Sequence, residues 1–198
     1  LNKSITSATA DPTWRLKSIN CVLDGHDPRL MDLLKLNHQQ SRDAAKKAVV
    51  DQLAKVKNSL TQLPPSLLLA ALSEPDRVVD GIAALTLYSL EEPRLYADIN
   101  TAMRIVGGSV EPKPRFTPSE AKHVVDAVQP FIKAVSWMLR EVLPKSRGVV
   151  FRGIGFELPQ PRIGSSHKMH CFTSTSKGKA EAEEFALRSL LVLSTASG

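Results

Sequence analysis

Apolar residues recur at three- and four-residue steps through the first two-thirds of the chain, which is the spacing of amphipathic helices. The first such series predicts a helix with Ser41 as its N-cap. Its apolar positions are Ala45, Val49, Leu53, Val56 and Leu60. The Pro64-Pro65 pair lacks backbone donors and ends this helix.

Three more helices follow the same periodicity. Residues 65–72 and 75–90 predict two short ones, and Pro75 suits the first position of the second, where its missing N–H has no intrahelical partner to lose. Residues 91–108 predict the third, which a closing Gly-Gly pair terminates.

The last predicted helix has the clearest beginning. Thr117 is its N-cap, Pro118 its first residue and Glu120 its third, so that side chains and backbone N–H groups satisfy one another in a capping box. Pro130 predicts a kink about midway, and Pro144 marks the end.

Beyond that proline the apolar period changes from helical to extended. Residues 148–158 predict a strand, residues 170–176 a strand that runs into a turn, residues 179–190 a short helix and residues 189–197 a buried strand. Helices first and strands last, without β-α-β alternation, predict an α+β fold. Residues 1–28 show neither period and predict an extended arm or tail.

Composition disfavours several classes of protein. Hydrophobic residues make up 42% of the chain and charged residues 23%, a balance typical of soluble globular domains. No apolar run approaches the length of a membrane span, and residues 1–10 lack the pattern of a secretory signal peptide. The net charge is +6, and residues 144–198 are basic, which favours an anionic ligand. Aromatics are only 5% and no basic run alternates with them, so a nucleic-acid partner is disfavoured.

Arg152 is the first candidate for a binding site. It lies on a strand with Val150 and Phe151, and Gly153 follows it directly. A guanidinium offers a rigid fork of donors that matches phosphate oxygens, and a glycine lets a ligand approach the backbone. The alternative interpretation is an edge-strand arginine on a solvated face. The Arg-Gly-Ile-Gly run does not open a helix, as a dinucleotide-binding glycine motif must.

The hydroxyl run Thr173–Ser176 is the second candidate. In a strand, Ser174 and Ser176 would share one face while Thr173 and Thr175 share the other. Two serines facing a cleft suit a carboxylate or a ribose, and the alternative is a polar strand end.

Two other patterns near this run are incomplete. Ser174 and Lys177 fit the S-x-x-K spacing of serine acylases, but the other elements of those enzymes do not occur. His167, His170 and Cys171 lack a further ligand pair that would complete a zinc tetrahedron, so no metal is expected.

Together these residues resemble the mono-ADP-ribosyltransferase family, in the branch named for its Arg, Ser-Thr-Ser and Glu-x-Glu elements. The first two elements would be Val-Val-Phe-Arg-Gly with Arg152 and Phe-Thr-Ser-Thr-Ser with Ser174–Ser176. Upstream, residues 85–104 are similar to the family's helix pair. Its characteristic places are occupied by Tyr88, Ile99, Asn100 and Arg104.

The resemblance implies a helical N-terminal part packed on a mainly antiparallel split β-sandwich. Residues 29–79 would be a helical appendage, and residues 80–198 a transferase core that is incomplete at its C-terminus. NAD would be the substrate and no metal would be needed.

The resemblance also implies roles for single residues. Arg152 would bind the NAD phosphates or the adjoining ribose, and Ser174 would hold the nicotinamide ribose and orient the catalytic carboxylate. Thr175 and Ser176 would brace the strand. Gly153 would let the nicotinamide amide approach the backbone.

The Glu-x-Glu element has no counterpart where the family has it. Glu181-Ala182-Glu183 has the right letters but begins five residues after Ser176, in a predicted helix. With Glu184, these carboxylates suit the first turn of a helix, where the helix dipole favours negative charge.

The implied function is that of an effector that transfers ADP-ribose from NAD to arginine of a host protein, if a Glu-x-Glu element lies beyond Gly198. Similar type III effectors of plant pathogens imply a secreted bacterial protein that acts in the host cytoplasm. The alternative is a catalytically silent protein whose cleft binds a peptide or another protein.

Overall fold

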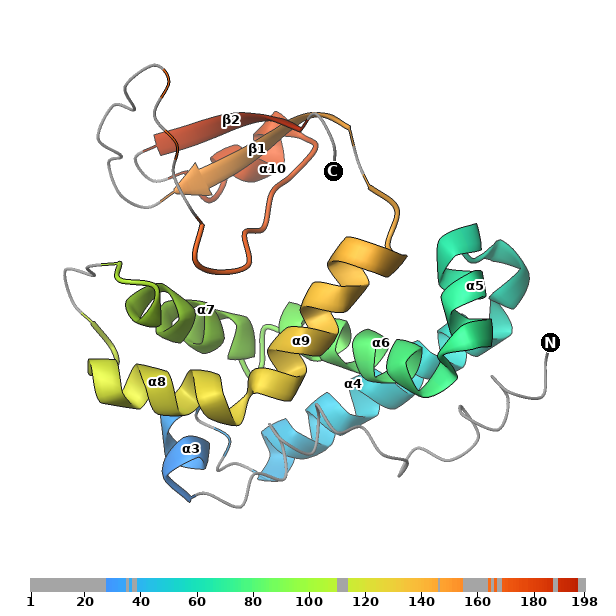
Figure 1. The fold of residues 1–198 in the computed structure, drawn as a ribbon, viewed down its shortest axis with the longest axis horizontal. Helices are drawn as coiled ribbons and strands as arrows, with labels where there is room; N and C mark the ends of the chain where they lie inside the picture. Colours follow the sequence, from blue (N-terminus) through green and yellow to red (C-terminus); the bar gives the residue numbers. More distant parts are fainter. Residues whose placement is uncertain are drawn as a thin grey trace. The chain divides into compact units, whose positions relative to one another are not determined.

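The computed structural model divides the chain into two compact units, a helical unit from Leu1 to Leu143 and a β unit from Pro144 to Gly198 (Figure 1). The described residues are 28–34, 36, 39–109, 114–145, 147–154, 164, 166, 169–186 and 189–195. Apart from Pro28, the predicted arm lies outside them. The division into an appendage at 29–79 and a core at 80–198 stays a prediction.

Helices make up the regular structure of the helical unit in the part of the chain that the structure describes. In chain order they are α3 (Pro28–Leu33), α4 (Gln39–Asn58), the 3-10 turn η1 (Leu60–Gln62), α5 (Pro65–Ser73), α6 (Pro75–Ser89), α7 (Leu95–Val106), α8 (Pro118–Ala127), α9 (Gln129–Trp137) and the π-helical turn η2 (Met138–Val142). In Figure 1, α7 lies beside α8, and α6 passes α9.

Prolines are the first residues of four of these helices, α3, α5, α6 and α8, as the sequence predicts for Pro75 and Pro118. The capping box of α8 is confirmed: the Thr117 hydroxyl accepts from the N–H of Glu120 at 3.2 Å, and the Glu120 carboxylate accepts from the N–H of Thr117 at 3.0 Å. Near Pro130 the helix does more than bend. It ends as α8 and restarts as α9, because proline cannot continue the hydrogen-bond ladder.

The beginning of α4 corrects the sequence analysis. The helix starts at Gln39, so Ser41 lies inside it and the prediction of Ser41 as N-cap is wrong. The side chain of Gln39 donates to the Asp43 carboxylate at 2.8 Å, a contact between positions i and i+4 that adds local support to this first turn. The first three positions of the apolar series are confirmed, because Ala45, Val49 and Leu53 are buried; Val56 is half-buried, and Leu60 lies beyond the end of α4.

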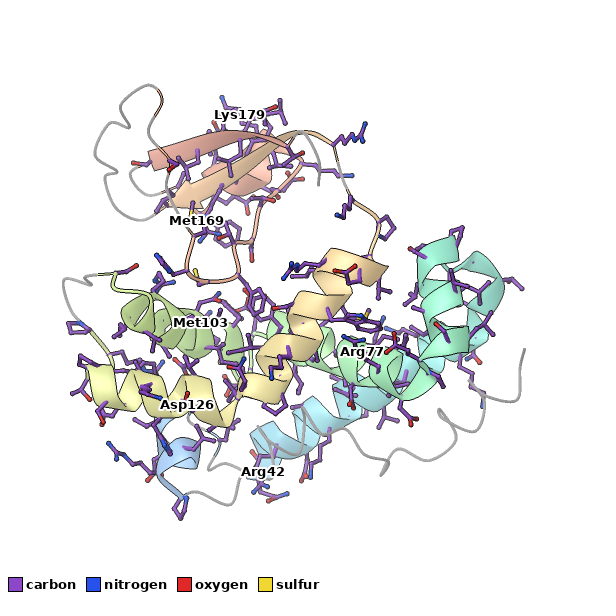
Figure 2. All side chains as sticks on the ribbon, in the orientation of Figure 1. Arg42, Arg77, Met103, Asp126, Met169 and Lys179 are labelled. Carbon is purple, nitrogen blue, oxygen red and sulfur yellow. The ribbon has the colours of Figure 1, made fainter. Side chains whose placement is uncertain are left out.

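The central helix of the helical unit is α6, which contacts α4, α5, α7, α9 and η2. Gly81 is needed there because the Met138 side chain of η2 occupies the place where a β-carbon would lie. Met138 is itself buried. Arg77, labelled in Figure 2, lies near the start of α6. Its guanidinium lies 4.2 Å from the ring centroid of Trp137 and ties α6 to α9.

In the β unit, the two described strands are β1 (Gly148–Ile154) and β2 (Ser189–Thr195), which pair antiparallel from Gly148 opposite Thr195 to Ile154 opposite Ser189. The helix α10 (Lys179–Glu183) packs against β1. Strands at 148–154 and 189–195 and a helix at 179 follow the sequence prediction, although α10 is shorter than expected. The α+β class is confirmed.

Two strand predictions need correction. Residues 170–175 do not form a strand, and the run pairs with β1 only through a single bridge between Ser176 and Phe151. Nor is β2 buried, because its side chains are half-buried or exposed and Val192 is 61% exposed. An apolar run satisfies the strand pattern whether or not a second layer covers it, so burial could not be inferred from the letters alone.

Candidate functional site

Arg152 lies near the middle of β1, and the strand's alternation decides where its side chain goes. The side chains of Val150, Arg152 and Ile154 lie on one face of β1. The side chain of Phe151 lies on the other face, as does the side of Gly153 where a β-carbon would stand. Val150 and Ile154 are buried, while Arg152 remains partly exposed. The strand therefore anchors the arginine between two apolar neighbours and leaves its charged end within reach of solvent.

The structure brings Arg152 and Ser174 together, 22 residues apart in the sequence. A guanidinium nitrogen, Nη1, donates to the backbone carbonyl oxygen of Ser174 at 2.7 Å. A guanidinium has five N–H donors, and this bond uses one of them. The contact fixes the position of the arginine while keeping a positive charge beside the hydroxyl run.

The hydroxyl run is held by its backbone at one point. The N–H and C=O of Ser176 each form a 2.8 Å hydrogen bond with the backbone of Phe151. Ser174 and Thr175 are exposed, and Ser176 is half-buried. Because the run is not a regular strand, the strand-based assignment of its hydroxyls to two faces does not apply, and Ser174 approaches Arg152 through its carbonyl.

Gly153 is closely approached on its bare side by α10. A β-carbon at this position would overlap backbone atoms of Ala182, Phe185 and Ala186. Its N–H and C=O point toward the same edge of β1 as those of Phe151, because backbone polar groups alternate between the two edges of a strand. That is the edge at which Ser176 is bound, and the role predicted for Gly153 toward a ligand stays a prediction.

The glutamates after the hydroxyl run belong to α10, as the sequence predicts. Glu181 lies in its first turn, and the carboxylate folds back over Gly178, the N-cap residue. Glu183 pairs with Lys179 at 3.1 Å; Lys179 is labelled at the start of α10 in Figure 2. These contacts account for both carboxylates as local features of a short helix.

The upstream residues of the resemblance have partners inside the helical unit. Asn100 Nδ2 donates to the hydroxyl of Tyr88 at 2.9 Å and joins α7 to α6. Ile99 is fully buried, and Arg104 donates to Thr101 Oγ1 at 3.0 Å. The bond between Asn100 and Tyr88 therefore joins the two helices, whereas the bond between Arg104 and Thr101 lies within α7.

Sequence reasoning missed an ion pair between the buried Asp98 of α7 and the more exposed Arg115. Asp98 is 3% exposed. A signal was present, because Asp98 lies among the apolar positions Leu95, Ile99 and Ala102 on one side of a helix, where a carboxylate needs a partner.

A second missed cluster surrounds Tyr96, whose hydroxyl lies 3.3 Å from both oxygens of Glu91. Burial raises the pKa of Tyr96 above its ordinary value of 10.0, and the negative charge of Glu91 adds to this effect. Arg94 pairs with the same glutamate at 3.0 Å. The cluster fixes the turn between α6 and α7.

Two searches of the described residues bear on other kinds of site. No group of three or more His, Cys, Asp or Glu side chains among them is arranged to hold a metal ion. No helix in the described ranges is both long and apolar enough to cross a bilayer.

Comparison with known proteins gives a family. The model of the NAD:arginine ADP-ribosyltransferase family matches residues 27–198, a range that includes β1, the hydroxyl run and the helices before residue 80. No solved structure matches the chain.

Two mammalian relatives also match. Ecto-ADP-ribosyltransferase 5 of Homo sapiens is 37% identical over 123 residues, which cover 60% of this chain and 40% of the relative. The Mus musculus protein of the same name is 33% identical over 119 residues, covering 58% of this chain and 37% of the relative. The matched region thus spans about 40% of the human relative's length. Because the family model covers most of the sequence, this chain belongs to the NAD:arginine ADP-ribosyltransferase family.

Proposed function

We propose that this chain binds NAD at Arg152 and the Ser174–Ser176 run and serves mono-ADP-ribosylation of arginine. The observation that carries the proposal is the 2.7 Å hydrogen bond from the Arg152 guanidinium to the Ser174 carbonyl, which joins two motifs of the family at one place. A guanidinium with remaining donors beside exposed hydroxyls suits a ligand that contains both phosphates and ribose.

The chemistry assigns simple tasks to these residues. In the transfer, the bond between ribose C1′ and the nicotinamide nitrogen breaks, a bond between C1′ and a guanidinium nitrogen of the acceptor forms, and the acceptor nitrogen loses a proton. Arg152 would neutralise the pyrophosphate, and Ser174 and Thr175 offer hydroxyls to a ribose. Gly153 would present its backbone N–H and C=O to the carboxamide of nicotinamide, since these groups point to the edge at which Ser176 lies.

Calorimetric titration of the chain with NAD tests the binding half of this proposal. Hydrogen bonds to charged groups contribute about 1.5–3 kcal/mol. We therefore expect Arg152→Ala to weaken binding by about tenfold or more, since each 1.4 kcal/mol is roughly a factor of ten. Arg147→Ala removes an exposed arginine just before β1 and should leave the affinity nearly unchanged. If the unaltered chain takes up no NAD, or both variants bind as it does, the proposal is wrong.

Transfer itself is a separate question with its own readout. In a protein that continues beyond Gly198 with a Glu-x-Glu element, we expect label from NAD to appear on an arginine-containing acceptor such as agmatine. This label should depend on Arg152. NAD binding without transfer would favour the alternative of a silent binding protein. Three further points stay proposals that rest on analogy: that the acceptor is a host protein, that the protein is a type III effector, and that it acts in the host cytoplasm. The relatives named above are mammalian.

A further inference from the structure

Three consecutive residues of β1 hold three successive parts of the chain between residues 174 and 186. The guanidinium of Arg152 binds the carbonyl of Ser174, and the backbone of Phe151 binds that of Ser176. The bare side of Gly153 faces the backbone of α10 and the turn that follows it. β1 thus binds the hydroxyl run at its edge and on one face, and contacts α10 on its other face.

We propose that Gly153 is a positioning residue for this site. By lacking a side chain it lets α10 lie directly on β1, and α10 in turn holds the Ser174–Ser176 run in reach of Arg152. The proposal rests on the proposed NAD site only for its ligand readout, since the placement of the run is a property of the chain alone.

The contact leaves no room for adjustment by rotamer changes. The atoms that a β-carbon at residue 153 would meet are the carbonyl oxygen of Ala182, the carbonyl carbon of Phe185 and the amide nitrogen of Ala186, all of them backbone. Ala182 is 3% exposed, so its helix turn is already tightly packed. Any residue other than glycine must therefore move α10 as a body away from β1.

A displaced α10 would move the hydroxyl run as well, because the connection is short. Only Lys177 and Gly178 separate Ser176 from the first residue of α10. Arg152 itself would not be touched directly, since its side chain leaves β1 on the opposite face. ADP-ribose lacks the nicotinamide that Gly153 would contact, so loss of ADP-ribose binding in a Gly153 variant would report on the position of the run rather than on Arg152 or on Gly153 itself.

The test compares amide hydrogen exchange and ADP-ribose binding in the full chain. In Gly153→Ala, we expect the amides of Phe151 and Ser176 to exchange at least about tenfold faster, because their shared hydrogen bonds open more often. ADP-ribose should bind about tenfold or more weakly, with amide exchange in α6 and α7 unchanged. Because the obstructing atoms are backbone, adding Phe185→Ala should not restore either property.

Two further variants keep the result interpretable. Leu193→Ala removes an apolar side chain from β2 without adding atoms between β1 and α10, and should destabilise the sheet with little change in affinity. Ala182→Gly loosens α10 without a clash, and should reproduce the exchange change in milder form if Gly153→Ala does not fold. The proposal would be overturned if the Ser176 amide exchanged at the unaltered rate in both Gly153→Ala and Ala182→Gly. It would also be overturned if Phe185→Ala restored the properties of Gly153→Ala, or if Leu193→Ala lost as much ADP-ribose affinity as Gly153→Ala. If the unaltered chain binds no ADP-ribose, the NAD proposal fails while the exchange result still decides this one.

Discussion

At the scale of single residues, Arg152 shows what sequence and structure each contribute. The arginine and the hydroxyl run can be found from the letters, because strand context, a following glycine and four consecutive hydroxyl residues are local features. The contact between them cannot, because Arg152 binds the carbonyl of Ser174. Every residue has such a carbonyl, so no residue type in the sequence marks this contact.

The ion pair of Asp98 and Arg115 leads to a prediction about stability. The side chain of Asp98 is 5% exposed and that of Arg115 is 39% exposed. Without Arg115 a buried carboxylate loses its countercharge, whereas without Asp98 the guanidinium can turn to water. We expect Arg115→Ala to lower the free energy of unfolding by about 3 kcal/mol and Asp98→Asn by less. Urea denaturation measures both, and a larger loss in Asp98→Asn would contradict this account.

The capping box of α8 predicts a pH dependence. Hydrogen bonds from the backbone and the side chain of Thr117 hold the pKa of Glu120 below its ordinary value of 4.5. A carboxyl whose pKa is lower in the folded state contributes stability above its unfolded pKa and loses it as the pH falls through the folded value. In Glu120→Gln, the melting temperature should therefore fall less between pH 7 and pH 3 than it does in the unaltered chain. The control Glu141→Gln, at an exposed residue, should leave this fall unaltered, and an unaltered fall in Glu120→Gln would refute the prediction.

At the scale of elements, helix starts marked by proline or by a capping box could be predicted, whereas the N-cap at Ser41 and the pairing of residues 170–175 could not. The starts of α6 and α8 follow from Pro75 and Thr117, because a helix start is decided within four residues. The predicted strand at 170–176 is wrong because strand pairing depends on distant residues, and only Ser176 pairs with β1, through its bridge to Phe151. The contact between the end of α10 and Gly153 also joins residues far apart in the sequence, so it could not be predicted from local patterns.

The packing of α6 on η2 predicts that Gly81→Ala has opposite effects on stability in the unaltered chain and in a Met138→Ala variant. Gly81→Ala should destabilise the chain, because overpacking against Met138 costs about 1–3 kcal/mol and the higher helix propensity of alanine returns only about 1 kcal/mol. In a Met138→Ala background the same change has room, so the propensity gain should make it stabilising. A double-mutant cycle by denaturant unfolding measures both steps. Equal destabilisation in the two backgrounds would show that Gly81 and Met138 do not compete for this space.

At the scale of the whole molecule, the central question is where NAD binds. The family is shown by the match over residues 27–198, and the α+β class agrees with it. The site rests on the β unit, in which Arg152, Gly153 and the Ser174–Ser176 run meet on or beside β1. If NAD bound elsewhere on the chain, the family assignment would still hold, but the proposed site would be wrong.

Amide hydrogen exchange of the full chain, with and without saturating NAD, tests this location most directly. We expect slower exchange in residues 148–154 and 170–178 when NAD is present, because the ligand would order the hydroxyl run against β1. We expect little change in α4 and α5. Slower exchange confined to the helical unit, with residues 148–154 and 170–178 unaffected by bound NAD, would contradict this location.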